Sequence, residues 1–360
     1  MQTQSHVSSP YSLGIDLHKR FAYWTLINNK RDILWEGKVL TDGEKTKSAA
    51  LALPVPANEC QAVIEPVELW GWYAEILEDC GIKVVMANPL QVALIAKSRM
   101  KYDKVDSKIL AELLQTGYLP RSYLAPRETR DLRHLLRTHI SLVVMRTRLK
   151  VKIHGAMELQ GLVSPLTDLF GRAGTAWLKE QELRPVYRRA IDTYLRLIDS
   201  INVELEQVDD EIEKKAKYDS DTKILMTMPG VGPFTALLIK AEVGTFDRFQ
   251  TPESLASFSG LIASSRSSGG KLRYGNITKQ GSKYLRWAMV QAASRMTPKA
   301  GDLYKFYVRI KDKKGAKIAR VALARKMLTI AWHIVKKKEP FQASFLGVSG
   351  SAKTVTLARI

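Results

Sequence analysis

Four acidic residues in the first third of the chain have the types and spacing of a metal-dependent site. Asp16 interrupts the apolar run LGIDL, and Glu65 ends the apolar run AVIEP. A carboxylate in an apolar strand is costly unless it is paired or binds a metal ion. Asp103 and Asp106 are three residues apart in KYDKVDSKILAELL, at the start of a predicted helix, so they share one helix face.

Carboxylates that converge repel one another, and a bound cation is the usual remedy. Four of them form a hard oxygen site suited to Mg²⁺, with Mn²⁺ as the alternative. Two such ions, about 3.5–4 Å apart, could activate an attacking oxygen and stabilise a leaving one. Taken singly, Asp103 or Asp106 is more simply a helix cap, and Glu65 a strand-end residue near solvent. His18 shares a strand face with Asp16 and is either a general base or, more simply, a satisfied surface histidine.

The elements that must position these acids follow from the apolar patterning. Three strands are predicted close together, at Tyr11–His18, Phe21–Ile27 and Ile33–Leu40. A fourth strand at Gln61–Ile64, a helix at Leu69–Cys80 and a fifth strand at Lys83–Ala87 follow. Three antiparallel strands followed by strand–helix–strand predict a mixed α/β sheet of the ribonuclease H kind. The first and fourth strands are neighbours in such a sheet, so Asp16 and Glu65 should meet at one edge.

Helices dominate the rest of the chain. From Asp103 to about Gly117 an apolar stripe predicts a helix, comprising Val105, Ile109, Leu110, Leu113 and Leu114. Arg127–His154 and Pro185–Tyr218 have helical periodicity and resemble the arms of a long hairpin with a poorly defined tip, Gln160–Glu182. We therefore predict a catalytic domain at 1–126, a coiled-coil-like hairpin at 127–219, a mostly helical C-terminal domain at 220–340 and a flexible tail at 341–360. Trp70, Trp72 and Tyr73 either pack the helix after Glu65 onto the sheet or stack on bases.

The charge of the chain favours a polyanionic partner. The formal net charge is +20, and residues 261–340 carry 20 Lys+Arg against three acids. Such a field favours nucleic acid over a solvated basic face or an anionic membrane. No apolar run is long enough to span a membrane, and the first residues lack the order of a signal peptide. With Cys60 and Cys80 as the only cysteines, we expect no disulfide framework and a reducing, cytoplasmic location.

Two C-terminal segments carry further candidate residues. MPGVGPFTALL, at 228–238, predicts a helix–hairpin–helix turn in which Gly230 and Gly232 expose backbone N–H groups to phosphate. The segment FSGLIASSRSSGGKLRYGNITKQGSKYLRWAMVQAA, at 258–293, combines serines, glycines and cations. On composition alone its Ser-Ser-Gly-Gly stretch is typical of a flexible loop.

These motifs resemble one known family. The order D…E…D-x-x-D, in GIDLHK, VIEP and KYDKVDSKILAELL, resembles the DEDD signature of transposases of insertion-sequence family 110, with their 116 and 902 relatives. Residues 258–293 resemble the C-terminal domain of that family, whose run of glycines and cations surrounds a functional serine. Matching by residue places this serine at Ser268, with Ser267 as the alternative.

The resemblance implies a fold and a function. The N-terminal domain would be RuvC-like, with Mg²⁺ held by Asp16, Glu65, Asp103 and Asp106. Ser268 would be the nucleophile that attacks DNA. Cations around it would stabilise the developing charge or bind nucleic acid: Arg266, Lys271, Arg273, Lys279, Lys283 and Arg286.

Members of the family resemble RNA-guided recombinases. They cut and rejoin donor and target DNA, guided by a structured RNA, as a homodimer or homotetramer. The resemblance thus implies a bacterial or archaeal, nucleoid-associated enzyme. Two alternatives stay open. One is a RuvC-like nuclease that uses metal-activated water, and the other is a non-catalytic nucleic-acid-binding protein.

Overall fold

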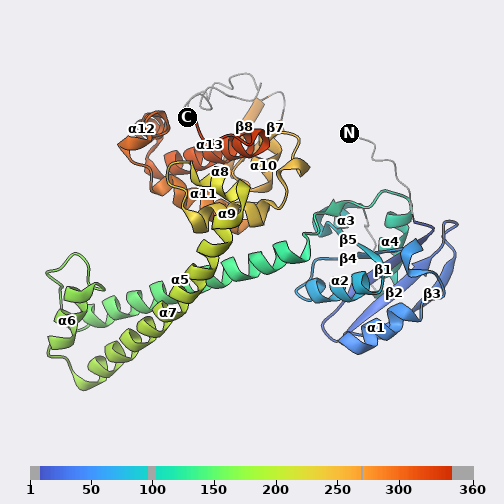
Figure 1. The fold of residues 1–360 in the computed structure, drawn as a ribbon, viewed down its shortest axis with the longest axis horizontal. Coiled ribbons are helices and arrows are strands. Elements are labelled where there is room, and N and C mark those ends of the chain that lie inside the picture. The colour runs from blue at the N-terminus through green and yellow to red at the C-terminus, as the bar shows by residue number, and fades with distance from the viewer. Residues whose placement is uncertain (1–8, 96–102, 269–270, 343–360) are drawn as a thin grey trace. The chain divides into compact units, whose positions relative to one another are not determined.

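The computed structural model describes residues 9–95, 103–268 and 271–342, with the side chains of 103, 104, 266–268 and 271–274 outside the description. The chain divides into two compact units, Met1–Arg130 and Asp131–Ile360 (Figure 1). Most of the predicted tail, 343–360, lies outside the described residues.

The first unit contains a six-stranded mixed sheet with the order β3-β2-β1-β4-β5-β6. Its strands are β1 (Tyr11–Leu17), β2 (Phe21–Ile27), β3 (Ile33–Leu40), β4 (Cys60–Ile64), β5 (Lys83–Ala87) and β6 (Arg121–Ser122). The first three strands are antiparallel, β4 and β5 run parallel to β1, and β6 is antiparallel to β5. This topology is consistent with the predicted ribonuclease H-like sheet. It confirms that the first and fourth strands are neighbours.

Helices cover both faces of this sheet. They are α1 (Gly43–Leu51), α2 (Trp70–Asp79), α3 (Pro89–Ile95) and α4 (Asp103–Gln115), with a short 3₁₀ turn, η1 (Ala57–Glu59). Figure 1 shows α1 and α2 on one side and α3 and α4 on the other. On the α2 side the indole Nε1 of Trp24 donates to the Tyr73 hydroxyl at 2.8 Å, and burial raises the pKa of Tyr73. Tyr73 therefore packs α2 onto the sheet, which is the first of its two predicted roles, packing and stacking on bases.

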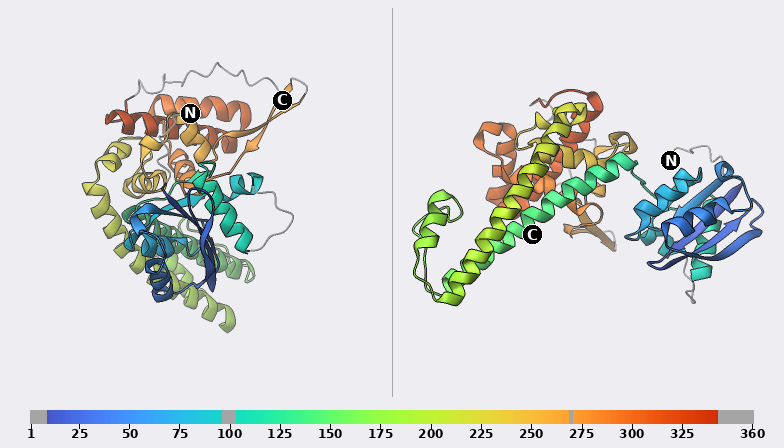
Figure 2. Two further views of the ribbon diagram at one scale, coloured as in Figure 1. Left: turned by 90° about the vertical axis from the view of Figure 1, so that its right-hand side faces the viewer. Right: turned by 60° about the horizontal axis from the view of Figure 1, so that its bottom comes forward.

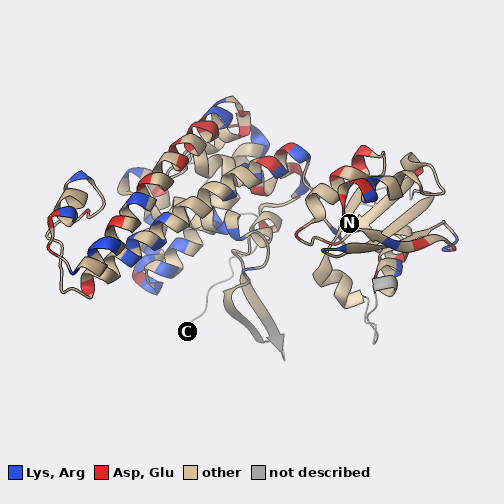
Figure 3. Ribbon diagram, turned by 90° about the horizontal axis from the view of Figure 1, so that it is seen from below, with Lys and Arg blue, Asp and Glu red and all other residues tan. Residues whose placement is uncertain are grey.

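The second unit contains a helical hairpin and a helical C-terminal part (Figure 2). The hairpin consists of α5 (Arg127–Glu158) and α7 (Pro185–Tyr218), with α6 (Arg172–Glu180) at its tip. The tip has its own small core, in which Ile153, Leu178 and Ile191 are fully buried. Charged residues lie along both long helices (Figure 3). Between Asp131 and Glu158 the charged residues of α5 are all basic, whereas acids predominate in α7 from Asp199 to Glu213.

The C-terminal part packs its helices around α9, most of which is buried, and around α13, which buries Ala319 and most of its apolar residues from Leu323 to Val335. Its elements are α8 (Ser220–Met226), α9 (Pro233–Val243), η2 (Phe246–Arg248), α10 (Pro252–Phe258), β7 (Ala263–Ser268), β8 (Lys271–Ile277), α11 (Lys283–Ser294), η3 (Pro298–Ala300), α12 (Asp302–Lys314) and α13 (Ala316–Lys337). The hairpin and this part belong to one compact unit. The division into three domains and a tail stays a prediction.

On composition alone the Ser-Ser-Gly-Gly stretch is typical of a loop. Its two serines end strand β7, which pairs with β8 in an antiparallel ribbon, and its two glycines lie outside the described residues. Within the described residues, no helix has the length and apolar character needed to cross a membrane.

Candidate functional site

Asp16 and Glu65 lie at the same end and on the same face of the sheet. The parallel pairing of β1 with β4 ends at Ile15 opposite Ile64, and the two acids follow directly. Side chains alternate along a strand, so residues in register on neighbouring strands share a face. Ile15 and Ile64 belong to the core beneath α1 and α2, so Asp16 and Glu65 face the α4 side. The Asp16 side chain is only 18% exposed.

Gly14 allows α4 to lie directly on β1. A Cβ atom at this position would be 1.9 Å from the carbonyl oxygen of Ser107 and 2.6 Å from the backbone nitrogen of Ala111. The Ser107 hydroxyl is 2.7 Å from the hydroxyl of Thr25 on β2. A helix can approach a strand this closely only where the strand carries glycine.

The direction of α4 brings its first turn to the acidic end of β1. At the other end of the helix, the Ser12 hydroxyl donates to Oε1 of Gln115 at 2.6 Å. Ser12, Gly14 and Asp16 follow one another on the same strand face, so the N-terminal turn of α4 lies toward Asp16. Asp106 is partly buried in that turn, and Asp103 begins the helix.

The backbone positions of the four predicted acids thus lie at the end of the sheet where β1 and β4 finish, but a closed ligand cluster is not seen. Among the described side chains, no three His, Cys, Asp or Glu residues gather closely enough to hold a metal ion. The side chain of Asp103 lies outside the described residues. Carboxylate donors on one face at one sheet edge fit a hard divalent cation chemically. The four-ligand site stays a prediction.

His18 lies beside Asp16. Its Nε2 is 2.9 Å from Oδ2 of Asp16, and its side chain is 44% exposed. This contact agrees with the simpler reading of a satisfied histidine near the surface. At the opposite end of the β1–β4 pair, burial raises the pKa of the Cys60 thiol to about 12, so Cys60 is a core residue without thiolate chemistry at neutral pH.

The predicted serine lies at the end of the β7–β8 ribbon. The backbone register pairs Ser268 with Lys271, Ser267 with Leu272, and Arg266 with Arg273. The ribbon therefore brings both candidate serines and several predicted cations into one short stretch of two strands. The side chains of these residues are outside the described part of the chain.

Several motif residues build the base of this ribbon. Gly260 and Gly281 have positive φ angles, and a Cβ atom would lie 2.4 Å from the Gln280 carbonyl oxygen and 1.9 Å from the Phe258 carbonyl oxygen, respectively. Lys279 also has a positive φ, and its backbone N–H donates to the Gly260 carbonyl at 3.2 Å. Gly260 and Gly281 are therefore needed for the backbone to fold in this way.

The remaining predicted nucleic-acid contacts differ in their surroundings. Lys279 and Lys283 are exposed, whereas Arg286 is half-buried and donates to the Ser259 carbonyl at 2.9 Å, which gives it a structural role. Gly230 has a positive φ, and a Cβ atom there would lie 2.6 Å from the Ala292 carbonyl oxygen, so it packs against α11. A Cβ atom added at Gly232 would have no heavy atom within 4 Å. The turn lies between α8 and α9, and its assignment as a phosphate-binding helix–hairpin–helix element stays a prediction.

Sequence reasoning missed a buried acid that holds the ribbon base. The Glu242 side chain is 4% exposed, and its Oε1 accepts from Nε and Nη2 of Arg137 at 3.0 and 2.8 Å. Its Oε2 accepts from the hydroxyl of Ser282, the N-cap of α11, at 2.8 Å. Arg133 donates to the carbonyl oxygens of Ala241 and Glu242. Glu242 is the one acid in the largely apolar run PFTALLIKAEV, and an acid within an apolar run is the same pattern that identified Asp16.

Comparison with known proteins decides the family. Residues 13–160 match a family model for DEDD transposases described as "Transposase", and residues 222–307 match the model described as "Transposase IS116/IS110/IS902 family". The chain belongs to the IS116/IS110/IS902 family of transposases. The two matched segments contain the acidic sheet edge and the serine-bearing ribbon.

Individual relatives agree with this assignment. The transposase for insertion sequence element IS1111A of Coxiella burnetii is 25% identical over 284 residues, which cover 75% of this transposase and 76% of the relative. A probable family 20 transposase of Pseudomonas aeruginosa is 24% identical, covering 78% and 85% of the two chains. The pilin gene-inverting protein of Moraxella bovis is 25% identical, covering 76% and 80%. Family membership makes the chain a DNA-cutting and rejoining enzyme of insertion sequences and suggests use of a divalent metal ion.

Proposed function

We propose that this transposase cuts and rejoins DNA by combining a metal-bound acidic site with a serine nucleophile. The observation that carries the proposal is the sheet edge in the first unit. Asp16 and Glu65 share one end and one face there, and α4 brings the turn with Asp103 and Asp106 to that end. We assign these four carboxylates as the ligands of Mg²⁺.

The acidic edge would act on phosphate. A divalent ion bound there would neutralise the carboxylates and polarise a phosphate oxygen. The protein itself contributes a fixed placement, because β1, β4 and α4 hold their acids through buried backbone contacts. Since Asp16 is largely shielded from water, its charge interacts more strongly with a nearby cation than an exposed carboxylate would.

Ser268 is assigned as the nucleophile of the second unit. Its hydroxyl oxygen would attack a DNA phosphorus, form a protein–DNA phosphodiester and release a DNA hydroxyl that takes up a proton. A second DNA hydroxyl would then attack the same phosphorus and displace the serine. Cations of the ribbon, among them Arg266, Lys271 and Arg273, would stabilise the charge that develops on the phosphate.

The partners belong to the same proposal. A structured RNA would select donor and target by base pairing, in the cytoplasm and at the nucleoid, and the enzyme would act as a homodimer or homotetramer. The absence of sequence-reading modules from the predicted domains suits this division, because pairing supplies the specificity. The Gly230–Gly232 turn would bind phosphate without regard to sequence.

A trapping experiment tests the serine assignment. Denaturing a reaction stalled on supercoiled element DNA should leave DNA covalently attached to the protein, and digestion should map it to the peptide containing Ser268. Ser268→Ala should lose both the adduct and the recombinant product, while Ser267→Ala keeps both.

Two other results would contradict the assignment of Ser268. Cleavage that gives only free ends would favour a nuclease that uses metal-activated water. An adduct that persists in Ser268→Ala and disappears in Ser267→Ala would move the nucleophile by one residue. Retained DNA binding in each variant shows that the loss is chemical.

A further inference from the structure

A basic pocket lies between α12 and α13, away from the ribbon segment that carries the predicted contacts. It has a volume of about 370 Å³ and is lined by Asp302, Lys305, Phe306, Arg309 and Lys326. The first four residues belong to α12 and the last to α13, so cations converge on the pocket from two helices. Three cations against one acid give the pocket a positive field.

The α12 side of the pocket presents its cations to solvent. Lys305 and Arg309 are one helical turn apart and both are exposed. Nζ of Lys305 donates to Oδ1 of Asp302 at 2.9 Å, so the acid of the pocket is engaged by its neighbour. The Arg309 guanidinium lies 5.5 Å from the ring centroid of Phe306. A guanidinium beside an aromatic ring offers both charge and a flat stacking surface.

The α13 side is less hydrated. Lys326 is half-buried, and its burial lowers the pKa of the ammonium group. An ammonium group that has lost part of its hydration gains more from a nearby anion than a fully solvated one does. Lys326 therefore adds a partly desolvated cation to the α13 side of the pocket.

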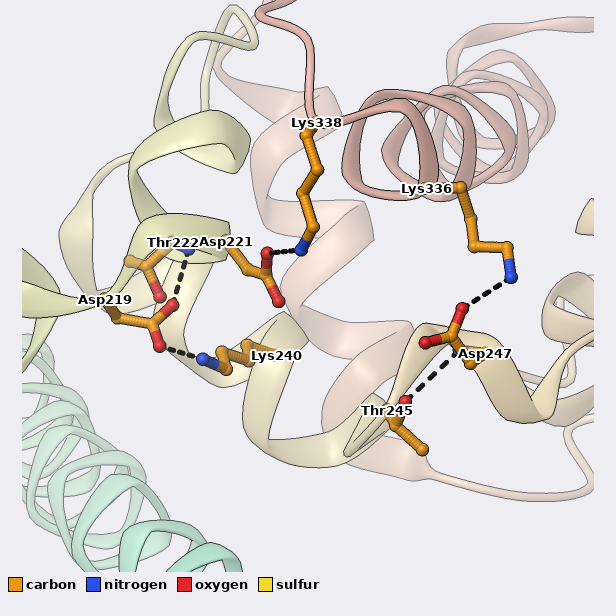
Figure 4. Close-up of polar contacts among 8 residues, drawn as sticks. All are labelled: Asp219, Asp221, Thr222, Lys240, Thr245, Asp247, Lys336 and Lys338. Carbon is orange, nitrogen blue, oxygen red and sulfur yellow. Dashed lines mark hydrogen bonds and ion pairs between the residues drawn. The ribbon is translucent and has the colours of Figure 1, made fainter.

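Other lysines of the same unit form ion pairs that join one segment of the fold to another. Lys240 pairs with Asp219, Lys338 pairs with Asp221, and Nζ of Lys336 donates to Oδ1 of Asp247 at 2.6 Å (Figure 4). Each of these pairs joins α13, its C-terminal end or α9 to another segment. Lys305 is bonded only one turn along its own helix, so its pair fastens no two elements together.

We propose that this pocket binds the phosphodiester backbone of nucleic acid without regard to base sequence. The phosphate would lie between Arg309 and Lys326, with Lys305 at the rim. This inference rests on the proposed function only in that nucleic acid is the substrate. It requires neither the metal site nor Ser268, and a binding measurement tests it independently of both.

Two double variants with the same change in charge test the proposal. The pocket variant is Arg309→Gln with Lys326→Met, which keeps the aliphatic stem of the lysine. The control is Lys311→Gln with Arg325→Met, which changes exposed cations on the same two helices that do not line the pocket. Affinity for duplex DNA of mixed sequence and for an RNA hairpin is measured by fluorescence anisotropy over a salt series.

The pocket variant should flatten the dependence of log Kd on log salt by roughly one unit for each lost phosphate contact, whatever the sequence. The control should keep the slope of the original protein. A loss seen with DNA alone or RNA alone would identify which strand occupies the pocket, and a loss with both would assign it to either backbone.

Equal slopes of log Kd against log salt in the two double variants would overturn the proposal. Such a result is expected if the positive charge of the whole unit attracts nucleic acid without a specific contact in the pocket. An unchanged slope in the pocket variant would overturn it as well. Thermal unfolding of both proteins checks the fold. If the double variant is destabilised, Arg309→Gln alone changes only an exposed residue and should still reduce the slope by about one unit.

Discussion

The two units of this transposase place their charges by opposite means. In the first unit, Asp16 and Glu65 come at the ends of buried strands, and α4 is set against β1 by a glycine that leaves no room for a side chain. In the second unit, positive charge is spread over exposed helix faces and a ribbon, and α12, α13 and α11 share it.

This difference matches the demands of the ligands. A divalent cation requires oxygen donors at fixed short distances, so its ligands need a rigid scaffold. A nucleic-acid backbone repeats its charge along its length, so many exposed cations can bind it without one fixed geometry. Changes in the first unit should therefore be all-or-none in activity, whereas changes in the second unit should be graded.

The largest effect is expected for the acids. Asp16→Asn or Asp106→Asn should lower strand cleavage by at least about a thousandfold, because a metal ion supplies several kcal/mol of charge stabilisation. Thermal stability in metal-free buffer should stay equal or rise, since repulsion between carboxylates is relieved. Plasmid cleavage and thermal unfolding measure the two quantities.

A matched control lies on the same helix. Glu112→Gln removes a partly exposed carboxylate of α4 that is 3.9 Å from Lys108 and should leave cleavage unchanged. If Asp106→Asn behaves like Glu112→Gln, the metal assignment fails for α4. The contrast between the two units would then lose its chemical basis.

The sequence predicted the first unit better than the second, for a physical reason. β2, β3 and β5 match their predicted bounds, and β1 and β4 differ by one residue, because alternating and apolar runs report burial locally. Helices α1 and α3 were missed because both are short and only one or two of their residues are buried. The order of acids along the chain was sufficient to predict which strands carry them.

The ribbon and the network around Glu242 depend on contacts that are distant in sequence. The β7–β8 pairing is anchored at Gly260 and Gly281, whose close approaches to Gln280 and Phe258 are not visible in a Ser/Gly-rich stretch. Arg137 and Glu242 are 105 residues apart. Local patterning does not report such pairs, although the glutamate itself stands out in its apolar helix.

A smaller effect is expected at the glycine that seats α4. Gly14→Ala should destabilise the first unit by about 3 kcal/mol, since the new Cβ meets backbone atoms of Ser107 and Ala111 that cannot turn away. Cleavage should fall with it, because the first turn of α4 moves relative to Asp16. Denaturant unfolding measures the stability, and cleavage is assayed where the variant is still folded.

The control for this change is Gly71→Ala in α2. No heavy atom lies within 4 Å of the added Cβ, and alanine favours a helix, so stability should be unchanged or higher. A Gly14→Ala protein with the original stability and activity would show that the sheet edge tolerates movement of α4. The acidic site would then be as adaptable as the cationic surface.

The smallest effect is expected for Glu242→Gln at the base of the ribbon. The amide keeps one accepting oxygen for Ser282, but its NH2 group cannot accept from the Arg137 guanidinium, so the second unit should lose about 1–2 kcal/mol of stability. Amide hydrogen exchange of residues 278–282 should quicken, because Ser282 caps α11 directly after that segment. Recombination should decline in proportion to the faster exchange, while the salt dependence of DNA binding stays the same.

The control is Glu211→Gln, which changes an exposed partner of Lys215 at 3.4 Å on α7 and should change stability by no more than about 0.5 kcal/mol. If Glu242→Gln abolished recombination with stability and exchange unaltered, the ribbon would require a geometry as fixed as that of the acidic edge, and the contrast between the two units would not hold.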